Sequence, residues 1–117
     1  MKPTRYFSKI QENKVARELG GKRTPNSGAT PYKKGDVTLG QAIDNGSWLL
    51  ECKTCTTYKK SFSIREEWLV TTKAESIQQG KLGYAVVFNF GPNEPNYYIV
   101  DEKTFKSFLE AENENNN

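Results

Sequence analysis

Apolar and polar residues follow a helical period near the N-terminus of the chain. At 100° per residue, Val15 and Leu19 fall on one arc of a helix, with charged residues outside it. The pattern predicts a helix over about residues 4–19, ended by the glycine pair that follows. Glu12 falls inside the apolar arc. Because burial of an isolated carboxylate is costly, we expect Glu12 to be paired or to bind something.

Strand-like runs and two further helices follow a polar loop at residues 20–35. The runs predicted as strands are residues 36–39, 48–53, 61–64, 82–90 and 97–100. The further helices are predicted over about residues 65–79 and 104–111. A turn signal, Asp44-Asn45-Gly46, indicates that the first two strands form an antiparallel hairpin. Ser63-x-x-Glu66 is a capping-box signature at the start of the middle helix.

The predicted order is helix, three strands, helix, two strands, helix. This order predicts an α/β fold in which helices flank a mixed sheet. Residues 1–111 are expected to form a single domain, and the Asn- and Glu-rich tail at residues 112–117 is expected to be disordered. No apolar stretch approaches the roughly 20 residues that cross a bilayer, and the polar N-terminus lacks the core of a secretory signal. We therefore expect a cytoplasmic protein with no membrane partner.

Positive charge is concentrated in the first third of the chain. The whole chain carries a formal charge of +3, yet residues 1–35 hold nine Lys or Arg against two Glu, a net +7 that leaves −4 for the rest. Such a segment favours a polyanionic partner, because each Lys or Arg that meets a phosphate releases a condensed counterion. The predicted nucleic-acid contacts are Lys22, Arg23, Ser27, Lys33 and Lys34. A flexible, solvated basic loop explains the same charge.

Two aspects of composition narrow the chemistry. The chain has no histidine, which excludes His-dependent nucleases, Ser-His-Asp hydrolases and Cys-His proteases, because their general base is missing. Cys52 and Cys55 cannot complete a zinc tetrahedron without another Cys or a His. Cys52 is better interpreted as a small buried apolar residue. Hydrolysis by this chain would therefore rely on carboxylates.

Acidic and basic residues combine on the predicted hairpin. Positions two apart on a strand point to the same face, so Glu51 and Lys53 project together. Asp36 opens the neighbouring strand, where its carboxylate can converge with that of Glu51 to hold a hard divalent cation. Phosphodiester hydrolysis uses such a set, with Lys53 positioning water or neutralising the phosphorane. Glu12 can complete the acidic cluster directly or through a metal-bound water. The catalytic candidates are Glu12, Asp36, Glu51 and Lys53.

Aromatic residues later in the chain have a simpler interpretation. Trp68, Phe88 and Phe90 lie in periodic segments and are predicted to be core residues rather than base-stacking platforms. The residues Tyr58-Lys59-Lys60, which follow the Glu51–Lys53 strand, fit either a DNA contact or a surface turn. The sequence does not choose between these two.

The candidate residues resemble the motif of the PD-(D/E)XK nuclease superfamily. Glu12 in a first helix, Gly35-Asp36-Val37 opening a strand and Glu51-Cys52-Lys53 closing the next carry the resemblance. Gly35 stands in place of the proline in the superfamily's name. The closer resemblance is to archaeal-type and phage-like Holliday-junction resolvases. In these, a helix with an acidic residue leads to a basic, serine-containing loop, then Asp, Glu-x-Lys, a strand, a helix and two strands.

This resemblance covers about residues 8–100, and Arg23 and Ser27 stand where the family has an arginine and a serine. It implies a restriction-endonuclease-like core and a Mg²⁺ ion, with Mn²⁺ as an alternative. The implied metal ligands are Asp36, Glu51, Glu12 and the backbone carbonyl of Cys52. It also implies a homodimer that acts on four-way junctions or other branched DNA, since a two-fold dimer supplies two sites.

Two alternatives share most of these features. A restriction or nicking endonuclease of the same fold would carry the same catalytic residues and differ in its DNA-reading surfaces. A non-catalytic DNA-binding module would use the basic segment and would tolerate loss of Asp36, Glu51 or Lys53.

Overall fold

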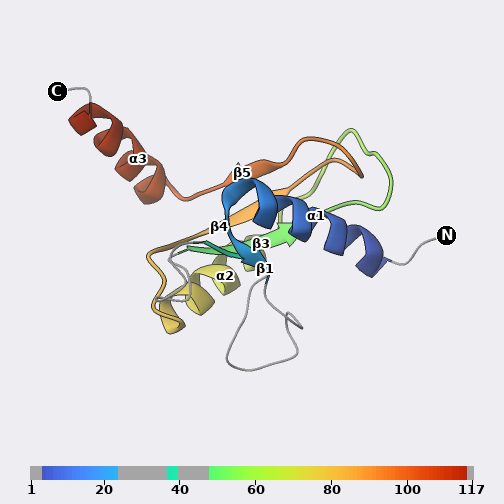
Figure 1. Ribbon diagram of the computed structural model, residues 1–117, viewed down its shortest axis with the longest axis horizontal. Helices are drawn as coiled ribbons and strands as arrows, with labels where there is room; N and C mark the ends of the chain where they lie inside the picture. The colour runs from blue at the N-terminus through green and yellow to red at the C-terminus, as the bar shows by residue number, and fades with distance from the viewer. Residues whose placement is uncertain (1–3, 24–36, 40–47, 116–117) are drawn as a thin grey trace.

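The computed structural model describes residues 4–23, 37–39 and 48–115, which fold as a mixed α+β protein (Figure 1). The elements in chain order are α1 (Thr4–Leu19), β1 (Lys22–Arg23), β2 (Val37–Leu39), β3 (Trp48–Lys53), α2 (Glu66–Gln78), β4 (Gly83–Phe88), β5 (Tyr97–Ile99) and α3 (Glu102–Asn115). None of the helices in these ranges is long and apolar enough to cross a membrane.

Helix α1 confirms the first prediction, including its end. Gly20 adopts φ +69°, a left-handed conformation that a residue with a Cβ enters only at a cost. The N–H of Gly21 then donates to the carbonyl of Ala16 at 2.8 Å, which satisfies a carbonyl of the last turn. The helix therefore stops where the glycine pair begins.

A five-stranded sheet runs in the order β1-β2-β3-β4-β5. Strand β2 is antiparallel to both of its neighbours, β1 and β3, and the predicted hairpin is confirmed by the pairing of Val37 with Leu50 and of Leu39 with Trp48. Strand β4 lies parallel to β3, because α2 carries the chain back across the sheet, and β5 returns antiparallel to β4. Strand β3 is therefore the centre of the sheet.

The strand predicted at residues 61–64 is wrong. Residues 54–65 contain neither helix nor strand, and Phe62 instead packs its ring against Phe88 at a centroid distance of 5.3 Å. Tertiary packing of this ring overrides the local strand signal. Three strands still precede α2, because β1 is a strand. It is two residues long and lies in the segment that was predicted to be a loop. The capping box is wrong too, since α2 begins after Arg65 without a side-chain cap.

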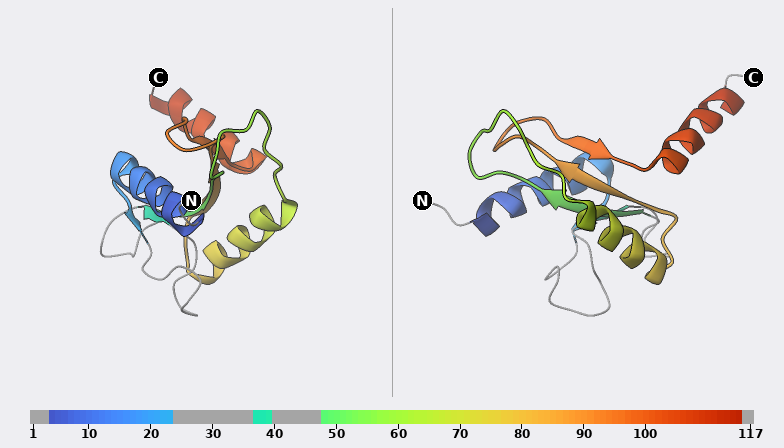
Figure 2. Two further views of the ribbon diagram at one scale, coloured as in Figure 1. Left: turned by 90° about the vertical axis from the view of Figure 1, so that its right-hand side faces the viewer. Right: turned by 180° about the vertical axis from the view of Figure 1, so that it is seen from behind.

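Helices α1 and α2 cover opposite faces of the sheet, as the edge-on view of Figure 2 shows. The α1 side holds the main core, made of Val15, Val37, Leu50, Cys52, Ala85 and Val87. On the other side, α2 buries two small polar residues, Thr72 and Ser76. Their hydroxyls donate to carbonyls of their own helix at 2.6 and 2.7 Å. Because these side chains are short and satisfied, α2 can lie close to β3 and β4.

Helix α3 projects away from the sheet (Figure 1), and none of its residues with a described side chain is buried. Its first turn is capped by Asp101, whose carboxylate accepts the N–H of Thr104 at 2.9 Å. The ring of Phe108 stacks on Trp48, with ring centroids 5.8 Å apart. The helix includes residues 112–115, which composition alone assigns to a disordered tail. Glutamate is a good helix former, so its abundance there is compatible with either state.

Candidate active site

Strand β3 places Glu51 and Lys53 on the face of the sheet that α2 covers. Leu50 and Cys52 alternate with them and point into the core on the α1 side. The strand holds this alternation because it is hydrogen-bonded on both sides, to β2 and to β4. The predicted shared face of Glu51 and Lys53 is therefore present.

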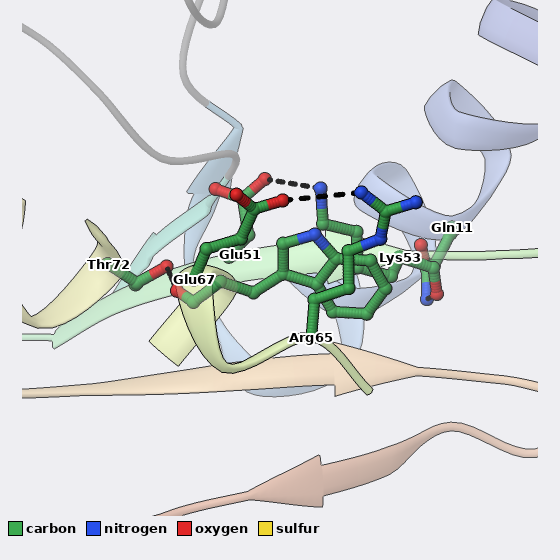
Figure 3. Close-up of polar contacts among 7 residues, drawn as sticks. Gln11, Glu51, Lys53, Arg65, Glu67 and Thr72 are labelled. Carbon is green, nitrogen blue, oxygen red and sulfur yellow. Dashed lines mark hydrogen bonds and ion pairs between the residues drawn. The ribbon is translucent and has the colours of Figure 1, made fainter. Parts of the chain in front are cut away.

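The two side chains form an ion pair. Oε1 of Glu51 lies 3.6 Å from Nζ of Lys53, with side-chain exposures of 22% and 30% (Figure 3). The ammonium group of Lys53 also lies over the ring of Trp68 in the first turn of α2, 4.8 Å from its centroid. A half-buried carboxylate and an oriented ammonium thus share a solvent-accessible position. The carboxylate can bind a metal ion, and the ammonium group can bind a phosphate.

Trp68 is a site residue that the sequence interpretation missed. It was predicted to be core, yet it is only half-buried and supports the lysine. Figure 3 shows Arg65 and Glu67, also from the start of α2, on the same side of the sheet as Glu51. They form their own exposed ion pair at 3.4 Å. Residues 54–65 separate β3 from α2 without regular structure, so no periodicity links these side chains to β3.

Glu12 reaches the sheet from the other side, on α1. It is buried, with 8% of its surface exposed, and its Oε1 accepts a hydrogen bond from Nε of Arg23 on β1 at 3.1 Å. The expectation that a carboxylate on the apolar arc must be paired is confirmed. Arg23, predicted to contact phosphate, is the cation in this pair, and Lys22 beside it is exposed.

A polar network fixes the end of β3. The side-chain amide of Gln11, which is buried next to Glu12 on α1, donates to the backbone carbonyl of Lys53 at 2.7 Å. Asn96 lies near the same amide and accepts a hydrogen bond from Asn89 at 3.1 Å. Asn89 in turn accepts one from Thr54 at 2.5 Å. The end of β3 is therefore tied to α1 through the carbonyl of Lys53, and Thr54 is tied to Asn89, which directly follows β4.

The predicted site residues are only partly among those that the structure describes. Asp36, Ser27, Lys33 and Lys34 lie outside the described residues. Across residues 4–23, 37–39 and 48–115, no three His, Cys, Asp or Glu side chains gather as a metal-binding group. Cys52, whose carbonyl was expected to be a ligand, turns its side chain into the core. The structure thus unites Glu51 with Lys53 and pairs Glu12 with Arg23.

Comparisons with known proteins add no relative. No family model, no curated protein and no solved structure matches this chain.

Proposed function

We propose that this protein is a metal-dependent DNA endonuclease in which Glu51 and Lys53 belong to the catalytic site. The observation that carries the proposal is their placement. A carboxylate and an ammonium group lie 3.6 Å apart, partly exposed, on one face of the central strand. Strand β2, which pairs with β3, begins at Val37, directly after Asp36 in the sequence. Asp36 is proposed as the second carboxylate.

The donor chemistry of these residues fits a hard divalent cation. Mg²⁺ retains several waters and is usually held by one or two carboxylates together with substrate phosphates, so Glu51 and Asp36 would suffice as protein ligands. A bound Mg²⁺ or Mn²⁺ would supply Lewis acidity and a water of lowered pKa. Lys53 would hold the scissile phosphate and offset its developing negative charge. Glu12, buried and paired with Arg23, is proposed to support this cluster from the α1 side.

The resemblance to Holliday-junction resolvases supports branched DNA as the substrate and a homodimer as the acting form. The element order of a first helix, a hairpin that closes with Glu-x-Lys, a helix and two strands is compatible with it. The strand that the family has between Glu-x-Lys and the next helix is not present here, where residues 54–65 form a loop. A preference for junctions over duplex is therefore the finer part of the proposal.

A cleavage assay with matched controls tests the chemistry. Glu51→Gln, Asp36→Asn and Lys53→Ala are each expected to abolish or greatly reduce Mg²⁺-dependent cutting of four-way junction and duplex DNA, while DNA binding survives. The control is the exposed pair Glu102 and Lys106 on α3, 3.5 Å apart, changed to Gln and Ala. Wild-type cutting rates for Glu51→Gln, or equal losses in the α3 control, would refute the assignment.

A non-catalytic DNA-binding module is the second candidate. The ion pair between Glu12 and Arg23 favours it, because that pair gives the buried carboxylate a structural role that needs no metal. Under this candidate the wild-type protein binds junction or duplex DNA, and no strand is cut at any Mg²⁺ or Mn²⁺ concentration.

A further inference from the structure

The loop between β3 and α2, residues 54–65, has an unusual composition for an exposed segment. It contains no Asp or Glu, although the chain has 14 of them, and it carries three cations, Lys59, Lys60 and Arg65. Four of its Ser and Thr residues have hydroxyl groups that can donate to phosphate, namely Thr56, Thr57, Ser61 and Ser63. In the middle of its sequence, Tyr58 is 61% exposed, and Lys59 and Lys60 beside it are also exposed.

This loop is held in place although it has no regular structure. The N–H of Lys59 donates to the carbonyl of Phe90 at 2.8 Å. Gly91 packs so closely that a Cβ there would stand 2.7 Å from the Cα of Tyr58. Phe62 anchors the second half of the loop in an aromatic cluster with Phe88, Phe90 and the ring of Trp68. The backbone around Tyr58 is thus fixed against the segment between β4 and β5, and the two run side by side in Figures 1 and 2.

The loop also starts at the candidate active site. It leaves β3 directly after Lys53, and Phe62 contacts Trp68, which supports the ammonium group of Lys53. A long, ordered loop beside a catalytic strand is typically functional rather than a simple connection. The loop therefore joins Lys53 to the helix whose Trp68 contacts it.

We propose that the β3–α2 loop is a binding site for unstacked DNA bases, with Tyr58 as the stacking platform and Lys59 and Lys60 as phosphate contacts. The identity of the ligand as DNA rests on the proposed nuclease function. An exposed aromatic ring next to cations is an arrangement that binds single strands, because every base has a π face and every nucleotide a phosphate. Bases within a continuous duplex are already stacked, so the ring of Tyr58 selects DNA with unpaired bases, such as a branch point or a single-stranded end.

Binding is measured by fluorescence anisotropy in EDTA, where no cutting can occur, with a labelled single-stranded oligonucleotide and the duplex of the same sequence. Tyr58→Ala is expected to weaken single-strand binding about fivefold or more, the low end of what one stacked base contributes, and to leave duplex binding nearly unchanged. Tyr58→Phe keeps the ring and should bind like the wild type. A 2-aminopurine base in the single strand should lose fluorescence on binding the wild type and Tyr58→Phe, but not Tyr58→Ala.

The lysines have a charge-matched control. Changing Lys59 and Lys60 together to Ala should weaken both DNAs and lower the salt slope of log K by about 1 to 2, as expected for two phosphate contacts. Changing Lys103 and Lys106 to Ala removes the same charge from α3, which projects from the opposite end of the molecule (Figure 1), and should have a smaller effect. Equal effects of the two lysine pairs would mean that general charge, not this loop, binds the DNA.

Failure of this inference is distinguishable from failure of the nuclease proposal. Single-strand binding that is unchanged in Tyr58→Ala, or absent in the wild type, overturns the stacking site even if the protein cuts DNA with Mg²⁺. If the protein binds single strands through Tyr58 but never cuts DNA, the result supports the stacking site and refutes the nuclease proposal.

Discussion

Replacing Glu12 by glutamine removes a buried charge and keeps the shape of the side chain. The Glu12 side chain is 10% exposed and that of Arg23 is 36% exposed, so the pair is neither fully buried nor a surface contact. Breaking a buried ion pair costs about 3–5 kcal/mol, and an exposed pair contributes about 0–1 kcal/mol. We therefore expect Glu12→Gln to lower the free energy of unfolding by about 1–2 kcal/mol.

The reciprocal change, Arg23→Gln, leaves the carboxylate of Glu12 in place without this cation. It is expected to cost about as much as Glu12→Gln or slightly more, because a desolvated charge loses a partner. The double variant should be less destabilised than the sum of the two single variants, with a coupling energy of about 1 kcal/mol. Urea unfolding of the wild type, both single variants and the double variant measures this value.

The same four proteins separate a catalytic from a structural role of Glu12. If Glu12 supports the metal cluster, Glu12→Gln lowers Mg²⁺-dependent cleavage about 10- to 100-fold with Arg23 present or replaced. Arg23→Gln would act mainly on DNA affinity. Wild-type cleavage by Glu12→Gln would remove Glu12 from the catalytic set and leave the ion pair as its whole explanation. A coupling energy below about 0.3 kcal/mol would refute the energetic reasoning itself.

Two further predictions concern α2 and α3. Trp68→Leu removes the ring under Lys53 and should slow cleavage severalfold, which corresponds to a cation–π contact of about 0.5–1 kcal/mol at a partly exposed site. Trp68→Phe keeps an aromatic ring and should retain most of the rate. Equal rates in both variants would contradict a role for the ring. The hydrogen bond from the backbone N–H of Thr104 holds the pKa of Asp101 below its usual value. The cap should therefore stabilise α3 fully above the unfolded pKa of about 3.9 and be lost as pH falls through the lower folded value, a change that circular dichroism follows as a loss of helix. Asp101→Asn, which caps without titrating, should reduce this acid loss, and an identical acid profile in the variant would exclude the cap as its cause.

The fold was predictable where local signals are strong. The helical arc around Val15 and the glycine pair after Leu19 locate both the buried face and the end of α1. The apolar runs that form β3 and β4 are long enough for the sequence to identify them as strands. Strand β1 has only two residues and no periodicity, so it exists through its pairing with β2. The segment around Phe62 has a strand-like composition, yet its ring packs against Phe88 of β4 and the segment does not pair as a strand.

The candidate site was predictable only along a single strand. The period of two places Glu51 beside Lys53, and the structure confirms their shared face. The position of Trp68 depends on how an irregular loop joins β3 to α2, which no local pattern encodes. The ion pair between Arg23 and Glu12 forms only because β1 pairs with β2. Contacts of this kind arise from tertiary structure. A sequence pattern can therefore identify candidate residues, but it does not predict which of them contact each other.

The side chain of Gln11 joins parts of the chain that are synthesised far apart in time. It donates to the carbonyl of Lys53, 42 residues later, and its amide lies 3.4 Å from Asn96, 85 residues later. Contacts of such high sequence separation form late in folding, because a long loop must close first. On a ribosome that adds about 5–20 residues per second, α1 emerges seconds before Asn96 exists. The end of β3 that carries Lys53 is therefore fully secured only after Asn96 has been synthesised, and a nascent chain that stops before Asn96 lacks part of this clamp.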